Sequence, residues 1–346
     1  MVLVLALAAA LWFAGRLFRV PSRVRLILIA VLYIAVLSIQ LVLPAGSSLR
    51  EATGGSATAW LVAGALAAAV WGYWRVLRHL RGRVRPENRA EAGASVSTAE
   101  VERNARHIAL REIGGTGQKR LKDARVLVVG AGGLGAPVLQ YLAAAGIGNI
   151  GVIDGDAVEN SNLQRQVIHT DARIGMPKVF SAQKAMVEQN PSVGIRPYNR
   201  RLTREIAADL FADYDLVLDG TDDVETRYMV NEFAVKGGIP LISGAISQWE
   251  GQVSVFDPAH GGPCYECVFP EPAAPGLAPS CAEAGVLGPL PGVLGTMMAV
   301  EAIKVVSGAG ETLRGSLLIY DALYGDTRSI KLSRRPDCPV CAGIPG

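Results

Sequence analysis

The chain has 346 residues, of which 50% are hydrophobic and 19% are charged, and its formal net charge is +3 at pH 7. Its mean hydropathy of +0.28 is higher than one soluble domain of ordinary size requires. A net charge this small gives no reason to expect a nucleic-acid-binding protein. The apolar excess lies before residue 75, so the N-terminal region differs in kind from the rest of the chain.

Three apolar stretches make up the N-terminal region. Residues 26–43 and 57–74 are uncharged, and each approaches the ~20 residues that cross a bilayer as a helix. Residues 1–15 are also uncharged but shorter, and no basic residues precede them as they would in a secretory signal peptide. We therefore predict a membrane anchor of three transmembrane helices at 1–85, a linker at 86–97 and a globular domain at 98–346.

Arginines between and after these stretches predict their orientation, because arginine collects on the cytoplasmic side of short flanking segments. Only Arg50, opposed by Glu51, lies between the second and third stretches. The arginines after the first and third stretches are Arg16, Arg19, Arg23 and Arg25, and Arg75, Arg78, Arg81, Arg83 and Arg85. We expect an outside N-terminus and a cytoplasmic globular domain held at the cytoplasmic (inner) membrane.

The globular domain shows the pattern of an α/β protein. Ser97 and Glu100 form an S-x-x-E capping pattern, which predicts a helix from there to about Arg111. From Arg125 on, short apolar runs alternate with helical stretches, which is typical of βαβ units and a mostly parallel sheet. Later strand runs, partly antiparallel, are 252–256, 316–320 and 327–332, with one long helix near 294–306. The predicted fold class is α/β with a mixed sheet.

A glycine-rich loop at 130–135 lies between the predicted strand 126–129 and a helical stretch. Its backbone N–H groups can face a phosphate at the start of the helix. Asp154 closes the second strand 19 positions after Gly135, where a carboxylate can accept hydrogen bonds from ribose. A NAD-dependent oxidoreductase would show the same arrangement, and so would a glycine turn that serves only close packing.

Three further motifs favour ATP and phosphoryl chemistry. Arg165 lies in the run Ser-Asn-Leu-Gln-Arg-Gln at 161–166, and Lys178 begins a helical stretch. Asp222 follows a strand, where its carboxylate could carry Mg²⁺ against a triphosphate. Each also has a plainer interpretation, since the cations could be solvated and Asp222 could be a helix N-cap. No Walker lysine motif is present, so a P-loop ATPase is disfavoured.

Four of the five cysteines form two Cys-x-x-Cys pairs, Cys264 with Cys267 and Cys338 with Cys341. Thiols in the cytoplasm stay reduced, and four thiolates suit tetrahedral Zn²⁺. We predict a structural zinc site that staples the C-terminal tail to the domain without an open position for chemistry. A redox-active pair is the alternative. Cys281 is left over, after a proline-rich stretch expected to be a loop.

From about Val101 to Cys341 the chain resembles the ThiF/MoeB/HesA adenylyltransferases, relatives of the ubiquitin-activating enzymes. The resemblance rests on the glycine loop, the Asp-Gly-Asp at 154–156, the motif at 161–166, the Pro-Lys pair at 177–178, the Thr-Asp pair at 221–222, and both Cys-x-x-Cys pairs. Residues 281–286 resemble the molybdopterin-synthase adenylyltransferase branch most. The resemblance implies a Rossmann-like fold, and the three N-terminal stretches lie outside it.

The resemblance implies a reaction between a protein and ATP. The C-terminal glycine carboxylate of a small ubiquitin-like sulfur-carrier protein attacks the α-phosphate and forms an acyl adenylate and pyrophosphate. The leading carrier is the small subunit of molybdopterin synthase, for cofactor biosynthesis, and the thiamine sulfur carrier is the alternative. Because the chain ends five residues after Cys341, we expect a separate sulfur donor.

The resemblance also implies roles for individual residues. Lys178 would hold the triphosphate and Asp222 the Mg²⁺, while Arg106 would reach into the site of a second subunit, so that a homodimer is the functional unit. Residues implied in nucleotide binding are Gly133, Asp154, Ser161, Asn162, Leu163, Gln164, Arg165, Lys178, Asp222 and Asp223. One departure is Asp223, where the family usually has Asn; an extra carboxylate could strengthen Mg²⁺ binding or repel the triphosphate.

Two points stay open from the sequence. A thiolate at Cys281 could attack the acyl adenylate and form a thioester or an acyl disulfide, as the resemblance implies, or it could be chemically silent. Two other classes of protein also remain as alternatives, a NAD-dependent oxidoreductase and a non-catalytic membrane scaffold that holds a ubiquitin-like partner. The oxidoreductase leaves Arg165, Lys178 and Asp222 unexplained.

Overall fold

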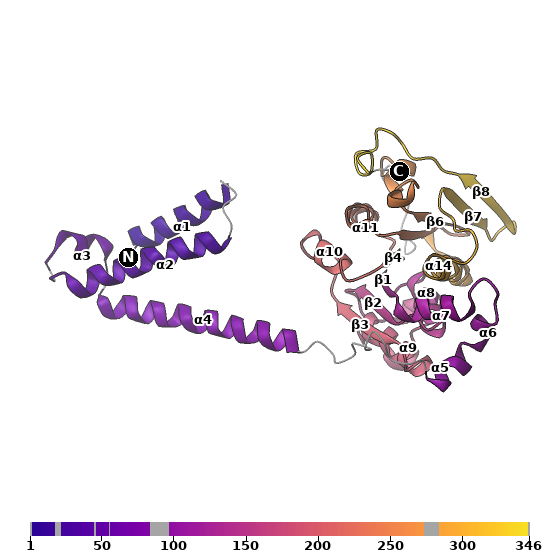
Figure 1. Ribbon diagram of the computed structural model, residues 1–346, viewed down its shortest axis with the longest axis horizontal. Coiled ribbons are helices and arrows are strands. Elements are labelled where there is room, and N and C mark those ends of the chain that lie inside the picture. The colour runs from indigo at the N-terminus through magenta and orange to yellow at the C-terminus, as the bar shows by residue number, and fades with distance from the viewer. Residues whose placement is uncertain are drawn as a thin grey trace. The chain divides into compact units, whose positions relative to one another are not determined.

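A computed structural model describes residues 2–17, 22–44, 46–54, 56–83, 97–272 and 284–344. The chain divides into two compact units, Met1–Glu87 and Asn88–Gly346 (Figure 1). Most of the predicted linker at 86–97 and the whole of the loop that carries Cys281 lie outside the described residues.

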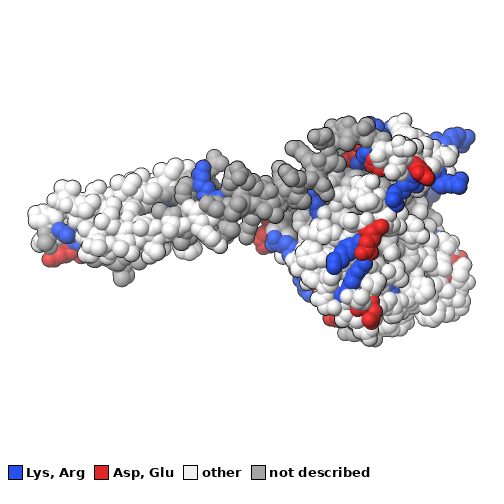
Figure 2. Space-filling view, turned by 90° about the horizontal axis from the view of Figure 1, so that it is seen from below, with Lys and Arg blue, Asp and Glu red and all other residues white. Residues whose placement is uncertain are grey.

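The first unit is helical and has a small core. Its helices are α1 (Val2–Leu17), α2 (Ser22–Val42), α3 (Ser48–Thr53) and α4 (Ala57–Arg83). Val4 of α1, Val36 of α2 and Trp60 of α4 are buried together. The Tyr33 hydroxyl donates to the Trp60 carbonyl at 2.8 Å, which ties α2 to α4. Charged side chains are few among the described residues on the visible face of this unit (Figure 2).

The predicted apolar stretches are therefore helical. Whether a helix can span a bilayer also depends on its length and composition. By length and composition, one helix in the described part of the chain could cross a membrane, and it is α14 (Pro289–Ser307) of the second unit. In the apolar part of this helix, 50% is buried inside the fold, which is also found for core helices of soluble proteins. The N-terminal unit contributes the shorter apolar helices Ala6–Gly15 and Ile27–Val42. The three N-terminal spans stay a prediction.

The second unit contains an eight-stranded sheet in the order β3-β2-β1-β4-β5-β6-β7-β8. Strands β1 to β5 pair in parallel, and β6, β7 and β8 add antiparallel strands to one edge. The strands are β1 (Arg125–Val129), β2 (Asn149–Asp154), β3 (Gly194–Asn199), β4 (Leu216–Asp219), β5 (Leu241–Ile246), β6 (Glu250–Phe256), β7 (Ser316–Asp321) and β8 (Asp326–Lys331). The predicted α/β class with a mixed sheet is confirmed.

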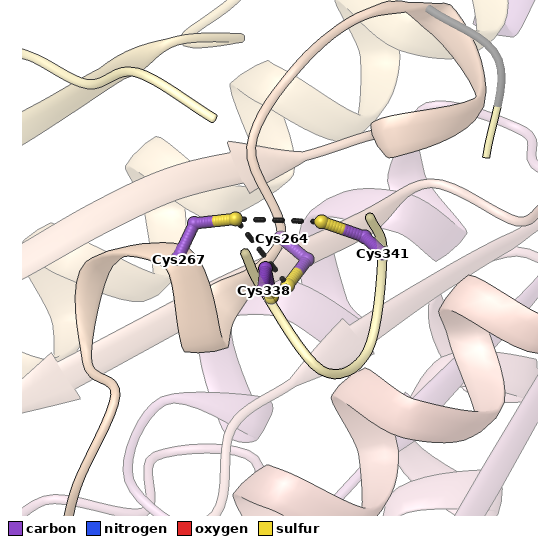
Figure 3. A group of neighbouring side chains, drawn as sticks. All are labelled: Cys264, Cys267, Cys338 and Cys341. Carbon is purple, nitrogen blue, oxygen red and sulfur yellow. Dashed lines mark hydrogen bonds between the residues drawn. The ribbon is translucent and has the colours of Figure 1, made fainter. Parts of the chain in front are cut away.

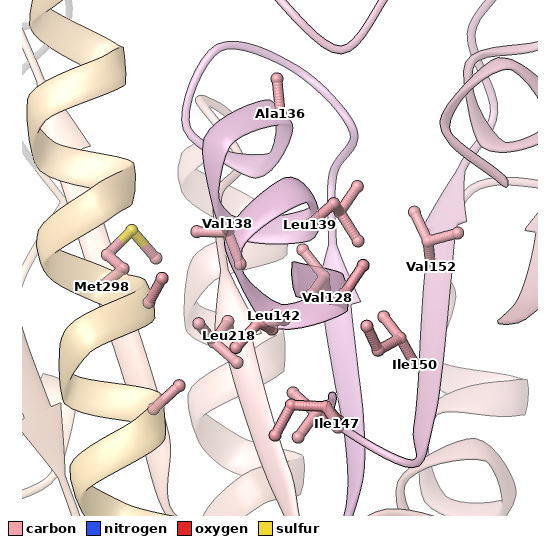
Figure 4. Packing of buried hydrophobic residues seen from close by; sticks show 14 of the residues in the cluster. Val128, Ala136, Val138, Leu139, Leu142, Ile147, Ile150, Val152, Leu218 and Met298 are labelled. Carbon is pink, nitrogen blue, oxygen red and sulfur yellow. The ribbon is translucent and has the colours of Figure 1, made fainter. Parts of the chain in front are cut away.

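Alternating strand residues separate two cores, one on each face of the sheet. Val126 and Val128 of β1 face α8 (Gly135–Ala144), α9 (Lys178–Gln189) and α14, whereas Leu127 and Val129 face α10 (Arg204–Phe211) and α11 (Val224–Gly237). Figure 4 shows Val138, Leu139 and Leu142 of α8 between Met298 of α14 and the strands. Helix α14 begins earlier than predicted, since proline is tolerated in a first turn.

The helix predicted from Ser97 to about Arg111 is wrong in its extent. The capping box between Ser97 and Glu100 is present, but the segment forms α5 (Thr98–Arg103) and α6 (Ala105–Ile108). Asn104 separates them, and its Nδ2 donates to the Glu100 carbonyl at 3.0 Å. Such a local side-chain bond competes with the helical ladder. Two further helices are α7 (Gly114–Asp123) and α12 (Tyr265–Val268).

Candidate functional site

The strand order predicts a ligand crevice at the carboxyl ends of β1 and β4. From β1 the chain continues to β2 and β3 on one side, and from β4 it continues to β5 on the other. Loops that leave neighbouring strands in opposite directions open a ligand crevice between them. The two loops start in contact, since the Gly220 N–H donates to the Val129 carbonyl at 3.0 Å. The glycine loop and the Thr-Asp loop therefore face one crevice.

The glycines of the loop have two different jobs. A Cβ on Gly135 would lie 2.0 Å from the Gly130 carbonyl oxygen, so Gly135 is required for packing. Gly130 has a φ of +92°, which also favours glycine. At Gly132, in contrast, the nearest atom to a Cβ would be Gln166 Nε2 at 3.7 Å, which is ordinary contact. The fold does not need glycine at 132, and its absent side chain leaves room for a ligand at the backbone.

Asp154 at the end of β2 holds the glycine loop. Its Oδ2 accepts from the Ala131 N–H at 2.8 Å, and its Oδ1 accepts from the Asp156 N–H at 2.8 Å. The carboxylate is half-buried and has further lone pairs, so it can also accept from a ribose hydroxyl. Gly133 lies at the other side of the loop, where a Cβ would be 3.1 Å from Pro291 of α14.

Lys178 is the most buried cation of the predicted site. It begins α9, and its side chain is only 8% exposed. Its Nζ donates to Asp156 Oδ2 at 3.0 Å, and its backbone N–H donates to the Asp156 carbonyl at 2.9 Å. The interpretation of Lys178 as a solvated surface charge is therefore wrong. Asp156 was missed as a site residue, although it stands in the Asp-Gly-Asp of the motif.

The motif at 161–166 forms a tight turn that begins with a 3-10 helix at Asn160–Asn162. Asn162 is buried, and its Oδ1 accepts from the Glu159 N–H at 3.2 Å. Arg165 is half-buried, and its Nη1 donates to the Ser161 carbonyl at 2.9 Å. Ser161 and Gln164 are exposed and Leu163 is half-buried. The turn thus orients the guanidinium of Arg165 through Nη1, and the other N–H groups of the guanidinium remain as donors for a phosphate.

Two buried side chains near the glycine loop were missed by the sequence analysis. Gln166 is 4% exposed, lies against Gly132, and its Oε1 has no hydrogen-bond partner in the described structure. His169 is also buried; its Nε2 lies 3.0 Å from the Ala131 carbonyl and its Nδ1 2.9 Å from Ser181 Oγ. Because a carbonyl can only accept, Nε2 donates and Nδ1 accepts. Burial lowers the pKa of His169, which keeps the ring neutral.

The two aspartates after Thr221 have separate roles. Asp223 is the N-cap of α11, since its Oδ2 accepts from the Thr226 N–H at 2.7 Å. Asp222 is exposed and forms no hydrogen bond or ion pair with the described residues. The interpretation of Asp222 as an N-cap is therefore wrong. Asn and Asp cap helices equally well, so the departure at Asp223 keeps the cap.

Two further residues belong to the predicted site, Arg106 and Cys281. Arg106 is exposed on α6 and forms no hydrogen bond or ion pair within the described part of the chain. Its role in the site of a second subunit stays a prediction. Cys281 lies outside the described residues.

The four paired cysteines form one buried cluster (Figure 3). Their Sγ atoms all lie within 4.8 Å of one another. Cys264 Sγ is 3.8 Å from Cys267 Sγ and 3.5 Å from Cys338 Sγ, and Cys267 Sγ is 3.4 Å from Cys341 Sγ. Four sulfurs at about 2.3 Å from a tetrahedral zinc would be about 3.8 Å apart. The four side chains therefore fit a zinc ion.

The cluster joins distant parts of the chain. Cys264 and Cys267 flank the start of α12, while Cys338 and Cys341 come from the tail after β8. Burial raises the pKa of Cys264 and raises that of Cys341 to about 11. Burial also acts upward on Cys338, but backbone N–H groups of Val340 and Cys341 lower its pKa overall. A cation in the cluster would favour the thiolate form of all four.

Comparison with known proteins gives consistent relatives. Residues 104–340 match the ThiF family. A sulfur carrier protein adenylyltransferase of Thermus thermophilus is 52% identical over 250 residues, which cover 71% of this chain and 92% of that protein. The SAMP-activating enzyme E1 of Haloferax volcanii is 46% identical over 71% of this chain and 91% of that protein.

Other relatives are longer or more distant. The probable adenylyltransferase/sulfurtransferase MoeZ of Mycobacterium tuberculosis is 51% identical over 72% of this chain, which spans only 64% of that protein. Among solved structures, PaaA has a TM-score of 0.61 at 22% identity, over 75% of this chain and 82% of that one. Escherichia coli MccB with ATP has a TM-score of 0.58 at 24% identity, over 66% and 70%.

These structural likenesses concern the fold alone, because the identities are low. The sequence relationship is far closer, with a family match through 104–340 and 52% identity over most of a curated protein. The resemblance expected from the motifs is thereby confirmed. The chain belongs to the ThiF family.

Proposed function

We propose that this protein uses ATP to adenylate the C-terminal glycine of a small ubiquitin-like sulfur-carrier protein. The observation that carries the proposal is the 52% identity to a sulfur carrier protein adenylyltransferase over 92% of its length. Three features support it: the open backbone at Gly132 after β1, the buried Lys178 paired with Asp156 just after β2, and the exposed Asp222 just after β4, each beyond the carboxyl end of one of three neighbouring strands. This set favours adenylyl transfer over a NAD-dependent oxidoreductase, which needs no triphosphate clamp.

The residues of the crevice bind and orient ATP in this proposal. Asp154 accepts from ribose while it holds Ala131, and the open backbone at Gly132 lies against the phosphates. Lys178 and Arg165 neutralise phosphate charge, and one hydrogen bond to the fold already orients each charged group. Fixed cations in a partly desolvated site stabilise developing charge without reorganisation.

The chemical step needs no general base. The terminal carboxylate of the carrier is ionised near pH 7, and one of its oxygens attacks the α-phosphorus. A new O–P bond forms, the bond from the α-phosphorus to the bridging oxygen breaks, and its electron pair leaves with pyrophosphate. Positioning and charge neutralisation therefore supply most of the catalysis.

Two metal ions complete the proposed protein. Mg²⁺ would neutralise the phosphates when bound, and the exposed Asp222, which has no partner among the described residues, fits it as a ligand. Asp223 is committed to capping α11, so we assign it no metal. Zinc would occupy the cluster of Cys264, Cys267, Cys338 and Cys341 and staple the tail to the domain.

The partners of the reaction are also proposals. We expect a carrier that ends in Gly-Gly, with the small subunit of molybdopterin synthase ahead of the thiamine carrier. We expect a homodimer in which Arg106 completes the site of the other subunit. MoeZ is named an adenylyltransferase/sulfurtransferase, and this chain spans 64% of it, so we assign only the adenylylation step. Attack by Cys281 on the acyl adenylate is a later step that trapping of a thiol-labile adduct would test.

We also propose that the N-terminal unit anchors the protein in the cytoplasmic membrane with the second unit in the cytoplasm. On α2, Ile27, Val31 and Ile34 are each about 60% exposed and share one helical face. Arg25 lies over the Trp12 ring at 4.6 Å, and tryptophan is enriched at membrane interfaces while arginine collects in the cytoplasmic segments beside a span. Retention of the full chain in membranes after a carbonate wash is expected, and its complete release would exclude an integral anchor.

The test of the enzymatic proposal is exchange of labelled pyrophosphate into ATP with purified sulfur carriers. We expect exchange with at least one carrier that ends in Gly-Gly and none with the same carrier after removal of its last glycine. Exchange with no such carrier would exclude the proposed function and leave the scaffold alternative. In that scaffold, Arg165→Ala would change neither carrier binding nor any cellular output.

A further inference from the structure

A buried network lies directly under the loop that carries Asp222. Asp219, the last residue of β4, is fully buried. Its Oδ1 accepts from both the N–H and the hydroxyl of Thr221, at 3.0 and 2.6 Å, and its Oδ2 accepts from the Ser243 hydroxyl at 3.2 Å. The carboxylate thus fixes the residue immediately before Asp222.

Arg227 of α11 completes this network. Its side chain is 9% exposed, its Nε lies 3.7 Å from Asp219 Oδ2, and its Nη2 donates to the Thr221 carbonyl at 2.5 Å. The N–H, hydroxyl and carbonyl of Thr221 are therefore all held by this one ion pair. A buried pair of this kind resists the loss of either partner, since a single charge would be left in the core.

The same face of α11 continues to the cysteine cluster. Arg227, Asn231 and Val235 follow each other at a spacing of four residues, which places them in one row along about 12 Å of helix. The Asn231 Oδ1 accepts from the Tyr265 N–H at 2.8 Å, between the first two cysteines. Val235 is buried with all four cysteines.

A second contact joins the segment that carries Cys264 and Cys267 to the start of α11. The rings of Tyr228 and Tyr265 meet edge to face at 5.3 Å, and the Tyr228 hydroxyl donates to the Phe269 carbonyl at 2.9 Å. Helix α12, which begins at Tyr265, is thus attached to α11 by a ring contact as well as by Asn231. The segment 264–268, which carries Cys264 and Cys267, is therefore held against α11 at two points.

We propose that Arg227 is a positioning residue for Asp222. The row Arg227, Asn231 and Val235 couples the two regions, so that disruption of the cysteine cluster loosens the Asp222 loop. The inference rests on the proposed function, because Asp222 matters there as the ligand of Mg²⁺. It goes further by giving the cluster a specific effect on the crevice. The four cysteines are far from Asp222 in the sequence, yet α11 connects the cysteine cluster to the Asp222 loop by direct contacts.

The variants separate positioning from folding. Arg227→Met removes both contacts, Arg227→Lys keeps the charge without the two-point geometry, and Thr221→Val removes only the hydroxyl bond to Asp219. The matched control is Arg204→Met, because Arg204 also pairs with a residue of α11, Glu232 at 2.6 Å, but is 58% exposed. The full-length chain is used throughout, and thermal unfolding identifies any variant that fails to fold.

The first readout is the Mg²⁺ concentration that gives half-maximal binding of ATP by calorimetry. We expect Arg227→Met to raise it about tenfold or more, since small displacements of positioned groups cost up to about 100-fold. Arg227→Lys and Thr221→Val should raise it less, and Arg204→Met should not change it. The KM for the carrier in pyrophosphate exchange should stay unchanged in every variant.

The second readout is amide hydrogen exchange of a peptide at 219–226. We expect faster exchange of this peptide in Arg227→Met and in Cys338→Ser. A control peptide at 138–147, which begins within α8, should exchange at the same rate in all variants. Wild-type Mg²⁺ dependence in folded Arg227→Met and Thr221→Val, or unchanged exchange in Cys338→Ser, would overturn the inference. Failure of the wild type to exchange pyrophosphate, with Mg²⁺-dependent ATP binding intact, would instead overturn the proposed function alone.

Discussion

Lys178 and Asp156 form an ion pair of 3.0 Å in which the lysine side chain is 8% exposed and the aspartate 54%. The pair joins the start of α9 to the segment after β2. By restricting the long flexible lysine side chain, Asp156 lowers the entropic cost of ordering its ammonium group against a phosphate.

The first prediction concerns this pair. Lys178→Met should lower the rate of pyrophosphate exchange by about 100-fold or more, because a positioned cation at the phosphates is lost. Asp156→Asn should lower it less, with most of the change in the KM for ATP, because the ammonium remains but is no longer held by a charge. Steady-state kinetics measures both. Equal losses in the two variants would contradict the positioning role of Asp156.

The second prediction contrasts two glycines of one loop. Gly135→Ala should destabilise the fold, since its Cβ would lie 2.0 Å from the Gly130 carbonyl oxygen. Gly132→Ala should leave the melting temperature nearly unchanged, because its Cβ would meet only Gln166 Nε2 at 3.7 Å. ATP binding by Gly132→Ala should nevertheless fall, since the methyl group occupies the phosphate side of the loop. Normal ATP affinity in that variant would place the phosphates elsewhere.

The third prediction concerns the residue that departs from the family pattern. Asp223→Asn should keep both stability and pyrophosphate exchange, because Asn caps a helix as well as Asp does. Asp223→Ala should cost about 1 kcal/mol of unfolding free energy by loss of the bond to the Thr226 N–H. Chemical denaturation of the two variants gives the comparison. A marked change in Mg²⁺ dependence in Asp223→Asn would show that this carboxylate binds the metal after all.

The fourth prediction concerns the cysteine cluster. Purified protein should contain about one zinc per chain, and Cys338→Ser should lose it and melt at a lower temperature, since structural zinc binding contributes folding free energy. Metal analysis with thermal unfolding measures both effects. A serine variant that keeps its full metal content would exclude the four-cysteine site. Reversible formation of a disulfide without any metal would support the redox alternative instead.

The fifth prediction is a dependence of stability on pH from His169. Burial lowers the pKa of His169 in the folded protein, while the unfolded ring has a pKa of about 6.5. The unfolded state therefore binds more protons below about pH 6.5, so the stability from the neutral ring is full above that pH and falls as the pH drops towards the folded pKa.

A variant isolates this dependence. The melting temperature of the wild type should fall more steeply than that of His169→Gln between about pH 6.5 and 5. The two curves should run parallel above pH 7, where the ring is neutral in both states. Parallel curves through the whole range would show that His169 has the same pKa in the folded and unfolded protein.

Local sequence was sufficient for much of this protein. The alternation of apolar runs predicted an α/β fold with a mixed sheet, because the spacing of apolar residues along the chain differs between strands and helices. The spacing of Cys264, Cys267, Cys338 and Cys341 predicted one cluster, since each pair by itself offers only two ligands to a metal that prefers four. The glycine loop, Asp154 and Lys178 marked the crevice because they stand at strand and helix ends.

Tertiary structure decided the roles of residues that the sequence alone could not distinguish. Asp222 and Asp223 are adjacent in sequence, and only the N–H of Thr226 determines that Asp223 is the cap and Asp222 is open. Gly132 and Gly135 are the same residue type, and only the atoms around each absent Cβ distinguish room for a ligand from close packing. His169 and Arg227 belong to none of the motifs, and Asp156 stands in one that did not reveal its pairing with Lys178. Their importance comes from contacts between elements that the sequence places far apart, and such contacts are set by how the sheet and helices pack.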